Sequence, residues 1–459
     1  MPEPAVTYDV AVIGAGVVGS AIARMLAGTH LSVALIDAAN DVGDGTSKAN
    51  TAILHTGFDA TPGTLEARLI ARGYHLMRDY AAATGIPIED TGAVLVAWTE
   101  AEVQALPGLL AKAQANGCAD ARLINTAAVY RLVPDLGEGA LAGMVVPGES
   151  IMCTWTATLA LATEAVRCGV TLHLDHRVTG VEVGSNCTAL HTTRGLVEAT
   201  WVINAAGLGG DELDRCFGHD RFTVTPRRGE LIVFDKLARP RVPMIVLPVP
   251  TSMGKGVLVS PTIYGNVMVG PTAEDITDRS ATGTTAAGLD YLLNKATKLL
   301  PALSHEEVTA TYAGLRAATE HPDYVIDLDF DRRYVLVGGI RSTGLSACLA
   351  IAEYVEELLG AAGVDLRLRG DLPPPPRMPH LGERGPRPYQ DYDLIAIDPA
   401  YGQIVCFCER VTSGEIRDAL AAELPPADLD GLRRRTRALN GRCQGFFCAA
   451  TVSALVPWE

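Results

Sequence analysis

The sequence lacks the features that would assign it to several common classes of protein. No segment reaches the ~18 uninterrupted apolar residues that a membrane-spanning helix needs. The stretch from Met1 to Leu26 has neither a basic start nor a cleavage site, so we expect no signal peptide. The net charge of −15 argues against nucleic acid as a partner, because phosphate binding needs clustered Lys and Arg. Together these absences favour a cytoplasmic protein.

A disulfide framework is also missing from the pattern of cysteines. The 10 cysteines of the 459-residue chain are not evenly spaced, which argues against a disulfide scaffold. Six of them are scattered along the chain, and most of these six are expected to be buried as small hydrophobic side chains. The six are Cys118, Cys153, Cys168, Cys187, Cys216 and Cys348. The other four lie near the C-terminus, where their spacing becomes informative.

The length of 459 residues predicts more than one domain, since single cores stop growing at roughly 250–300 residues. The chain opens as a β–α–β unit, with a strand at 8–13, a helix at 17–27 and a strand at 31–36. Strand-like stretches then alternate between two regions of the chain. A proline run between Asp371 and Pro379 favours an extended spacer. The predicted division is a first domain over 1–84, 146–214 and 306–370, a β-rich domain over 85–145 and 215–305, a linker over 371–394 and a small domain over 395–459.

A glycine-rich turn follows the first predicted strand and opens the first predicted helix. Gly14 permits a tight turn, Gly16 lets the backbone approach a pyrophosphate, and Gly19 lets helix and strand pack closely. The start of the helix then offers unpaired N–H groups and partial positive charge. Asp37, at the end of the second strand, can accept a hydrogen bond from a ribose hydroxyl. This pattern predicts dinucleotide binding, although it does not separate FAD from NAD.

The next segment distinguishes the two cofactors through a resemblance. Residues 45–59 and 62–68, which begin Gly-Thr-Ser-Lys-Ala-Asn and Pro-Gly-Thr-Leu, resemble the D-amino-acid-oxidase-like superfamily of flavoenzymes. The resemblance is closest to its glycerol-3-phosphate dehydrogenase and L-2-hydroxyglutarate oxidase branches. Further matches are 202–207, 229–231, 270–274, 314–316 and 338–345. Asp37 departs from the pattern, because the FAD branch more often has Glu there, which leaves the ribose contact open.

The resemblance implies how FAD is held. In such proteins the loop after the second strand passes beneath the flavin, and the closest branches bind FAD noncovalently, whereas some other members link it to a histidine. A helix beginning at 342–345 would aim its positive end at the flavin ring, worth up to ~2 kcal/mol; alternatively, Ser342 or Thr343 simply caps that helix. The implied contacts are Thr46, Ser47, Asn50, Ala52, Val178, Ala206, Gly207, Gly339, Ser342, Thr343, Gly344 and Leu345.

Three residues are candidates for the chemistry. His55 is the candidate base, because imidazole titrates near neutral pH; the alternative is a core histidine or one that only packs against the flavin. Arg316 and Arg341 are candidate anchors for a substrate anion, because a guanidinium binds two oxygens at once. The alternative for both arginines is a structural ion pair or a solvated loop. Tyr264 and Thr272 are weaker candidates to reach the pocket from the second domain.

The C-terminal cysteines form a C-x-C pair and a C-x4-C pair. Four thiolates in a small domain suit a thiophilic metal, either zinc or an iron–sulfur cluster. Residues 405–416 and 441–448 resemble the bacterioferritin-associated-ferredoxin-like [2Fe-2S] domain, which implies that the cluster is held by Cys406, Cys408, Cys443 and Cys448. Arginines crowd the segment 433–442, where positive charge would raise the potential of a cluster; the alternative is a solvated helix face.

These observations predict an α/β protein with a Rossmann-like FAD-binding domain, an interleaved β-rich substrate domain and a small helical [2Fe-2S] domain. We expect a dehydrogenase that oxidises a small anionic alcohol, first of all glycerol 3-phosphate. Electrons would pass from flavin to cluster and on to an acceptor protein or partner subunit, membrane-associated or not. The alternatives are a 2-hydroxy-acid dehydrogenase, an amine or imino-acid dehydrogenase subunit, and a non-catalytic electron-transfer subunit.

Overall fold

The computed structural model of the chain describes residues 7–250 and 256–458. The outer ends of the predicted domains at 1–6 and 459, and the segment 251–255 within the β-rich one, lie outside the described residues. Within the described part of the chain, none of the helices is both long and apolar enough to cross a membrane.

The first sheet is built around the predicted β–α–β unit. β1 (Thr7–Ile13) pairs in parallel with β2 (Val33–Ile36) and with β12 (Gly195–Asn204), and α1 (Val17–Ala27) connects β1 to β2. β2 begins later than predicted, because the backbone N–H of Ser32 donates to the Asp9 carboxylate. The sheet is completed by β9 (Thr171–His173), β10 (Val178–Val183), β11 (Thr188–Thr192), β19 (Val325–Asp329) and β20 (Tyr334–Gly338).

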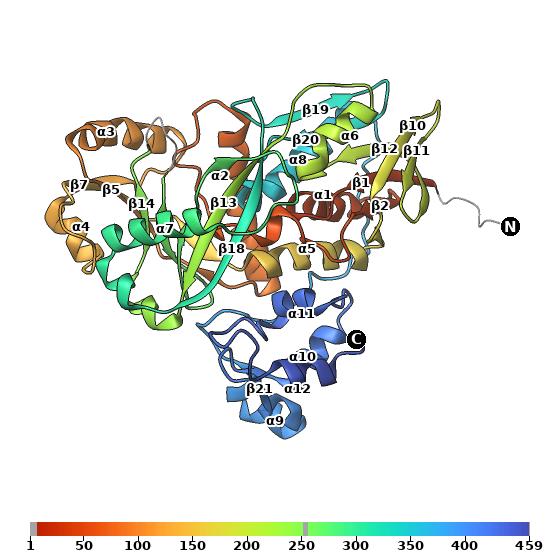
Figure 1. The fold of residues 1–459 in the computed structure, drawn as a ribbon. Helices are drawn as coiled ribbons and strands as arrows, with labels where there is room; N and C mark the ends of the chain where they lie inside the picture. Colours follow the sequence, from red (N-terminus) through yellow and green to blue (C-terminus); the bar gives the residue numbers. More distant parts are fainter. Residues whose placement is uncertain (1–6, 251–255, 459) are drawn as a thin grey trace.

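Apolar helices pack together against this sheet. α1 contacts both α5 and α8, and α8 contacts α2, so one core joins segments from both ends of the first 361 residues. The other helices of this core are α2 (Leu65–Thr84), α5 (Thr154–Arg167) and α8 (Gly344–Ala361). In Figure 1, α5 lies between the first sheet and the C-terminal domain. A short helix, α6 (Gly210–Cys216), follows β12.

A second sheet of nine strands forms the β-rich part of the molecule. Its longest strands, β13 (Thr225–Phe234) and β18 (Val308–Ala318), are antiparallel and cross the centre of Figure 1. The others are β5 (Ala93–Ala97), β6 (Arg122–Asn125), β7 (Ala142–Val146), β14 (Ile245–Pro248), β15 (Leu258–Pro261), β16 (Val267–Gly270) and β17 (Glu274–Asp275). The helices of this part are α3 (Glu100–Ala115), α4 (Thr126–Leu132) and α7 (Ala286–Leu299). A small three-stranded sheet of β3 (Ile53–Leu54), β8 (Ser150–Met152) and β4 (Ile88–Glu89) lies beside them.

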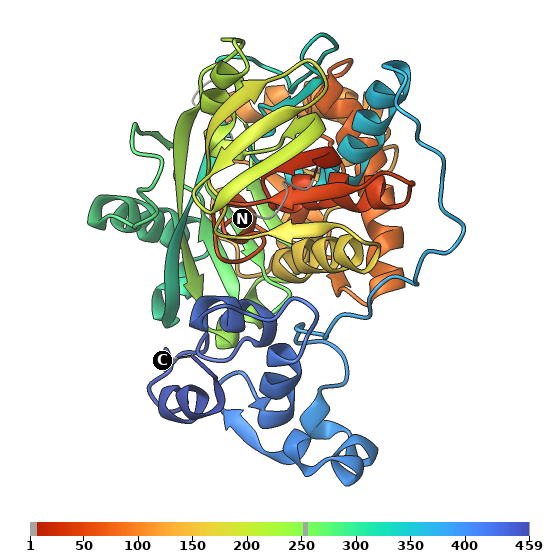
Figure 2. The same cartoon turned by 90° about the vertical axis from the view of Figure 1, so that its right-hand side faces the viewer.

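The C-terminal domain lies below the two sheets and has its own apolar core. Residues 371–380 are neither helix nor strand, and Figure 2 shows this segment running along the outside of the molecule toward that domain. The domain contains α9 (Tyr392–Ile397), β21 (Ile404–Cys406), β22 (Val411–Thr412), α10 (Ser413–Leu420), α11 (Leu429–Thr436) and α12 (Ala449–Leu455). The predicted fold class, with interleaved α/β and β-rich parts and a small helical domain, is therefore confirmed.

Candidate cofactor and active site

The glycine turn between β1 and α1 leaves no room for side chains. Gly14 has φ +107°, and a Cβ there would lie 2.4 Å from the Ala205 carbonyl oxygen. A Cβ on Gly19 would lie 1.8 Å from the Gly14 carbonyl oxygen. Gly16 is the N-cap of α1 and, as a glycine, makes no side-chain capping bond of its own. The first turn of α1 therefore has the backbone of a pyrophosphate site.

Asp37 helps to shape this turn. Its carboxylate accepts hydrogen bonds from the backbone N–H groups of Ala15, at 2.6 Å, and Ala39, at 2.8 Å. Burial raises the pKa of Asp37, although those backbone bonds act in the opposite direction. A carboxylate has about four acceptor positions, so a ribose hydroxyl can still bind; that contact stays a prediction.

The segment after β2 is fastened to both the glycine turn and the second sheet. Ser47 Oγ accepts from the backbone N–H of Val17 at 2.9 Å, and Thr46 Oγ1 donates to the Leu315 carbonyl at 2.8 Å. The Asn50 side chain donates to the Ser47 carbonyl and accepts from the N–H of Ala52, which has φ +54°. These hydrogen bonds explain why the loop carries polar side chains at the place where the two sheets meet.

The start of α8 lies against the start of α1. A Cβ on Gly344 would contact side chains of Val17 and Val18 at 3.8 and 3.4 Å. Thr343 is the N-cap residue, but its side chain makes no capping bond, so the capping alternative is wrong for Thr343. Its hydroxyl instead pairs with Glu66 and Tyr324. The N-termini of α1 and α8 therefore lie side by side, and the partial positive charge of each favours an anion nearby.

The remaining predicted cofactor residues are held in turns or at the same core. Gly207 and Gly339 have φ values of +55° and +69°, which favour glycine. Val178 and Ala206 pack against one apolar cluster beside β1. Leu345 is buried in the first turn of α8, and Ser342 directly precedes its N-cap. Their roles toward FAD remain predictions.

His55 is coupled to a buried carboxylate that the sequence analysis did not identify. Its Nδ1 lies 2.9 Å from Glu149 Oε2, and the Glu149 side chain is 0% exposed. Because an ionised carboxylate only accepts hydrogen bonds, Nδ1 is the donor in this contact. The backbone N–H of His55 donates to Ser346 Oγ in α8 at 2.8 Å. The sequence signal for Glu149 was a single acid directly before the apolar strand β8.

The two candidate arginines have different surroundings. Arg341 forms an ion pair with Glu66 at 2.5 Å and donates to the Pro322 carbonyl. Arg316, on β18, donates to the Thr272 carbonyl at 2.9 Å and forms no ion pair with a residue that the structure describes. Burial lowers the pKa of Arg316 and the nearby charge of Arg227 adds to that effect, while the charge of Asp275 opposes it. A partly buried guanidinium that forms no salt bridge is the better anchor for a substrate anion.

The four predicted cysteine ligands lie together in two pairs. Cys448 lies close enough to Cys406 to help raise its pKa, and Cys443 lies close enough to Cys408 to do the same there. Burial raises the pKa of Cys406 to about 11, although the nearby backbone N–H groups of Glu409 and Leu439 act in the opposite direction. Backbone N–H groups, that of Phe447 first, lower the pKa of Cys443.

This arrangement fits a cluster with two irons, each of which takes two cysteine ligands. In the described parts of the chain, no group of three or more Cys, His, Asp or Glu side chains lies closely enough together to hold a metal ion, so the assignment of a cluster rests on the two cysteine pairs. The N–H donors also suit the partial negative charge of ligating sulfurs. Gly441 supports the same site, because its lack of a side chain lets its backbone lie close to Cys408. A Cβ on Gly441 would lie 2.1 Å from Cys408 Cβ.

Comparison with known proteins agrees with both halves of this arrangement. Residues 9–358 match the model of the FAD dependent oxidoreductase family, and residues 404–457 match the BFD-like [2Fe-2S] binding domain. The chain belongs to the FAD dependent oxidoreductase family. The predicted enzyme class and the two cofactors, FAD and a [2Fe-2S] cluster, are thereby confirmed.

The relatives include proteins that act on glycerol phosphate and on hydroxy acids. A glycerol 3-phosphate dehydrogenase of Caloramator mitchellensis is 33% identical over 98% of this chain and 94% of its own length. An L-2-hydroxyglutarate dehydrogenase of Arabidopsis thaliana is 27% identical, over 76% of this chain and 82% of its own length. The FAD-bound structure of the L-alpha-glycerophosphate oxidase of Mycoplasma pneumoniae superimposes with a TM-score of 0.77 at 28% identity, covering 82% of this chain and 99% of that one.

The extents of these matches differ in an informative way. The match to the dehydrogenase of Caloramator mitchellensis extends over the C-terminal domain, because it covers 98% of this chain. The oxidase structure is almost fully covered, yet 18% of this chain has no counterpart in it (100% less the 82% covered). This FAD dependent oxidoreductase therefore carries a BFD-like [2Fe-2S] domain in addition to its FAD half, and such a domain implies electron transfer to an acceptor.

Proposed function

We propose that this flavoenzyme is a glycerol-3-phosphate dehydrogenase that oxidises the secondary alcohol to dihydroxyacetone phosphate. The observation that carries the proposal is the partly buried guanidinium of Arg316, which forms no salt bridge with the described residues. Phosphate has the charge and the paired oxygens that an arginine fork binds. The full-length similarity to a protein named glycerol 3-phosphate dehydrogenase supports the same substrate.

The place of Arg316 relative to the cofactor loop supports this role. Its neighbour Leu315 accepts a hydrogen bond from Thr46, so β18 runs past the polar loop of the FAD site. Arg341 has a supporting role in the proposed site, since Glu66 already neutralises it. In this proposal Arg316 is the primary anchor, and Arg341 orders the segment that precedes α8.

His55 is the proposed base. Glu149 holds the Nδ1 proton, so that Nε2 is free to accept the proton of the substrate hydroxyl. A fixed tautomer and a buried carboxylate partner are the arrangement in which a histidine serves this role best. When bound, FAD supplies the hydride acceptor, and the cluster supplies the one-electron outlet.

An anaerobic absorption spectrum before and after adding glycerol 3-phosphate tests the proposal. Bleaching of the flavin bands by that substrate is the expected result. Bleaching by L-2-hydroxyglutarate but not by glycerol 3-phosphate would transfer the assignment to a hydroxy acid, and bleaching only by amines or imino acids would transfer it to that class. No bleaching by any of them, with both cofactors present, would favour a non-catalytic electron-transfer subunit.

The identity of the acceptor and the boundaries of the domains belong to the same proposal. We infer that the acceptor is a protein or partner subunit that takes one electron at a time. A membrane-bound partner would also fit this description. A reducing compartment such as the cytoplasm suits the protein, because none of its ten cysteines, all of which the structure describes, forms a disulfide. The division at residues 84, 145, 214, 305, 370 and 394 is proposed from the sequence and is testable by expressing 395–459 alone.

A further inference from the structure

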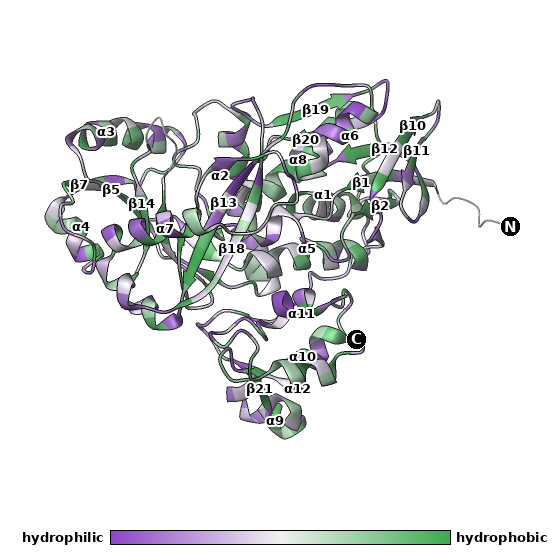
Figure 3. Cartoon of the chain, in the orientation of Figure 1, coloured by the Kyte–Doolittle hydropathy of each residue, from purple (hydrophilic) through white to green (hydrophobic). Residues whose placement is uncertain are grey.

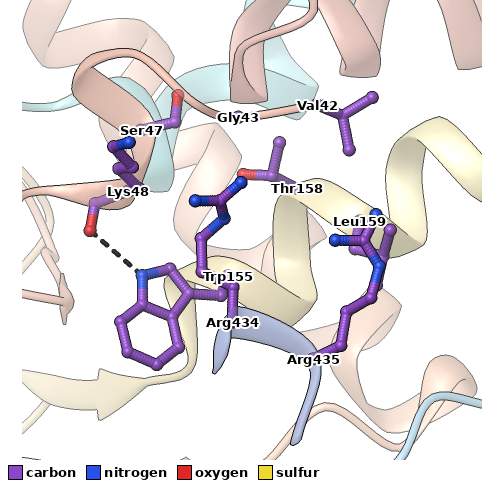
Figure 4. Close-up of a pocket in the computed structure, with 9 residues that line it drawn as sticks. All are labelled: Val42, Gly43, Ser47, Lys48, Trp155, Thr158, Leu159, Arg434 and Arg435. Atoms are coloured by element: carbon purple, nitrogen blue, oxygen red, sulfur yellow. Dashed lines mark hydrogen bonds between the residues drawn. The ribbon is translucent and has the colours of Figure 1, made fainter. Parts of the chain in front are cut away.

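The C-terminal domain is held to the FAD half by buried arginines of α11. Arg435 makes two bonds of 2.7 Å to the Asp41 carboxylate, and Arg434 binds both Asp41, at 2.7 Å, and Asp44, at 2.8 Å. The Arg434, Arg435 and Asp41 side chains are only 10, 5 and 3% exposed. Figure 3 shows α11 as a hydrophilic helix facing the FAD half, and Figure 4 shows both arginines lining one pocket with Lys48. The solvated-face alternative is therefore wrong for these arginines.

Arg437 follows α11 and continues the interface. It has φ +72° and is buried, with its guanidinium 4.1 Å from the centre of the Tyr264 ring and 5.8 Å from that of Trp155. The two rings stack on each other at 5.1 Å. Tyr264 therefore lies against the C-terminal domain, and its hydroxyl contacts Cys153. An arginine stacked on an aromatic pair is a desolvated cation–π contact.

This layer touches the cofactor sites on both of its sides. Toward FAD, Trp155 Nε1 donates to the Lys48 carbonyl at 3.0 Å, and the adjacent Ser47 binds the first turn of α1. Toward the cluster, Arg437 pairs with Glu409 at 3.1 Å, and Glu409 directly follows the predicted ligand Cys408 in the chain. A continuous run of contacts thus joins the two sites.

We propose that Trp155, Tyr264 and Arg437 form the contact layer through which electrons leave the FAD half for the [2Fe-2S] domain, with Arg437 as the positioning residue. This inference rests on the proposed function only in taking glycerol 3-phosphate as the natural source of the electrons. The substrate gives up two electrons as a hydride, and its hydroxyl proton goes to His55. The cluster accepts one electron at a time, so two transfers cross this layer per substrate, each completed by an external one-electron acceptor.

The contact layer matters for the rate because electron transfer slows steeply as the distance between two redox centres increases. The buried arginine pairs keep the C-terminal domain docked, whereas the linker over 371–380 alone would let it move. Loss of the Arg437 side chain would open a void against Tyr264 and leave Glu409 with Lys236 as its remaining partner. Docking at the ring pair would then loosen, while the sites of FAD and the cluster would stay intact.

The test follows both cofactors in the full-length holoenzyme under anaerobic conditions. Flavin bleaching by glycerol 3-phosphate is recorded by stopped flow, and cluster reduction by freeze-quench EPR. In Arg437→Ala we expect the FAD content, the iron content and the rate of flavin bleaching to be unchanged. Cluster reduction should slow by about tenfold, because a small displacement of two reacting groups is enough to reduce a rate by at least that factor. Arg433→Ala is the matched control, because Arg433 lies on the same helix and pairs with Asp430 instead of the FAD half.

A second variant and a second electron source keep the inference testable on its own. Tyr264→Leu removes the ring from the FAD side and is expected to slow the same step if Arg437→Ala does not fold. Where glycerol 3-phosphate does not bleach the parent, the proposed function fails, and photoreduction of the flavin replaces the substrate. Cluster reduction at the parental rate in both variants overturns the inference. A loss equal in Arg433→Ala and Arg437→Ala overturns it as well, because the effect would then be general.

Discussion

Replacement of Asp41 by asparagine is the most direct test of how the two halves are held together. The Asp41 side chain is 3% exposed and receives three hydrogen bonds from arginines, one from Arg434 and two from Arg435. The substitution would leave two buried guanidinium groups without their shared charge. Removal of one partner of a buried ion pair costs roughly 3–5 kcal/mol, and the amide oxygen preserves one acceptor. We therefore expect a loss of about 3 kcal/mol, at the lower end of that range.

The loss should be confined to the docking of the C-terminal domain. Because a multidomain protein does not unfold in a single two-state step, the two halves must be followed separately. Cluster absorption reports the C-terminal domain, and flavin fluorescence reports the FAD half. Limited proteolysis across 371–380 reports undocking, since that segment is neither helix nor strand. Asp41→Asn should be cut faster than the parent at the same temperature.

The control is Asp430→Asn, which removes an exposed acid from the same interface helix. Asp430 is 62% exposed and pairs with Arg433, and exposed pairs contribute about 0–1 kcal/mol. If Asp41→Asn loosens the domain no more than Asp430→Asn does, the buried arginine cluster does not hold the interface, and the reasoning is wrong.

The pH dependence gives a second, independent reading of the same contact. Burial alone would raise the pKa of Asp41, but the hydrogen bonds and charges of Arg435 and Arg434 lower it. A carboxyl group with a lowered folded pKa stabilises the protein above its unfolded pKa of about 3.9, and this stability is lost as pH falls through the folded pKa. The parent should therefore undock as the pH falls below about 4, and Asp41→Asn should lack that step.

Three further predictions concern the cofactor and substrate sites. Arg316→Gln should raise the KM for glycerol 3-phosphate by roughly 30-fold, equivalent to about 2 kcal/mol for a lost charge-assisted bond, whereas Arg227→Gln should not, because Arg227 already pairs with Asp275; equal effects in steady-state assays would exclude Arg316 as the anchor. His55→Asn should slow flavin bleaching by about 10²–10⁴-fold and Glu149→Gln by less, and stopped-flow rates equal to the parent would remove His55 as the base. Cys443→Ser should lose iron while retaining FAD and substrate-driven bleaching, and an iron assay that finds the cluster intact would remove Cys443 from the ligand set.

Much of the local chemistry was predictable from the sequence because it depends on residues close together in the chain. The glycine turn at 14–19 needs a tight backbone, so residue type and spacing alone indicate it. The cysteine pairs near 406 and 443 indicate a metal site in the same way. The fold class followed from the alternation of apolar runs, and the family and cofactors were confirmed by comparison.

What the sequence could not provide were the contacts between residues far apart in the chain. Glu149 lies 94 positions from His55, and Asp41 lies 394 positions from Arg435, so no local pattern links them. From the sequence, the arginines near the cysteines were expected to serve the cluster or to face solvent, yet three of them bind Asp41, Asp44 and the Tyr264 ring. Only the folded chain decides which buried charge meets which, because an ion pair or ring contact depends on distance in space and not on separation in sequence.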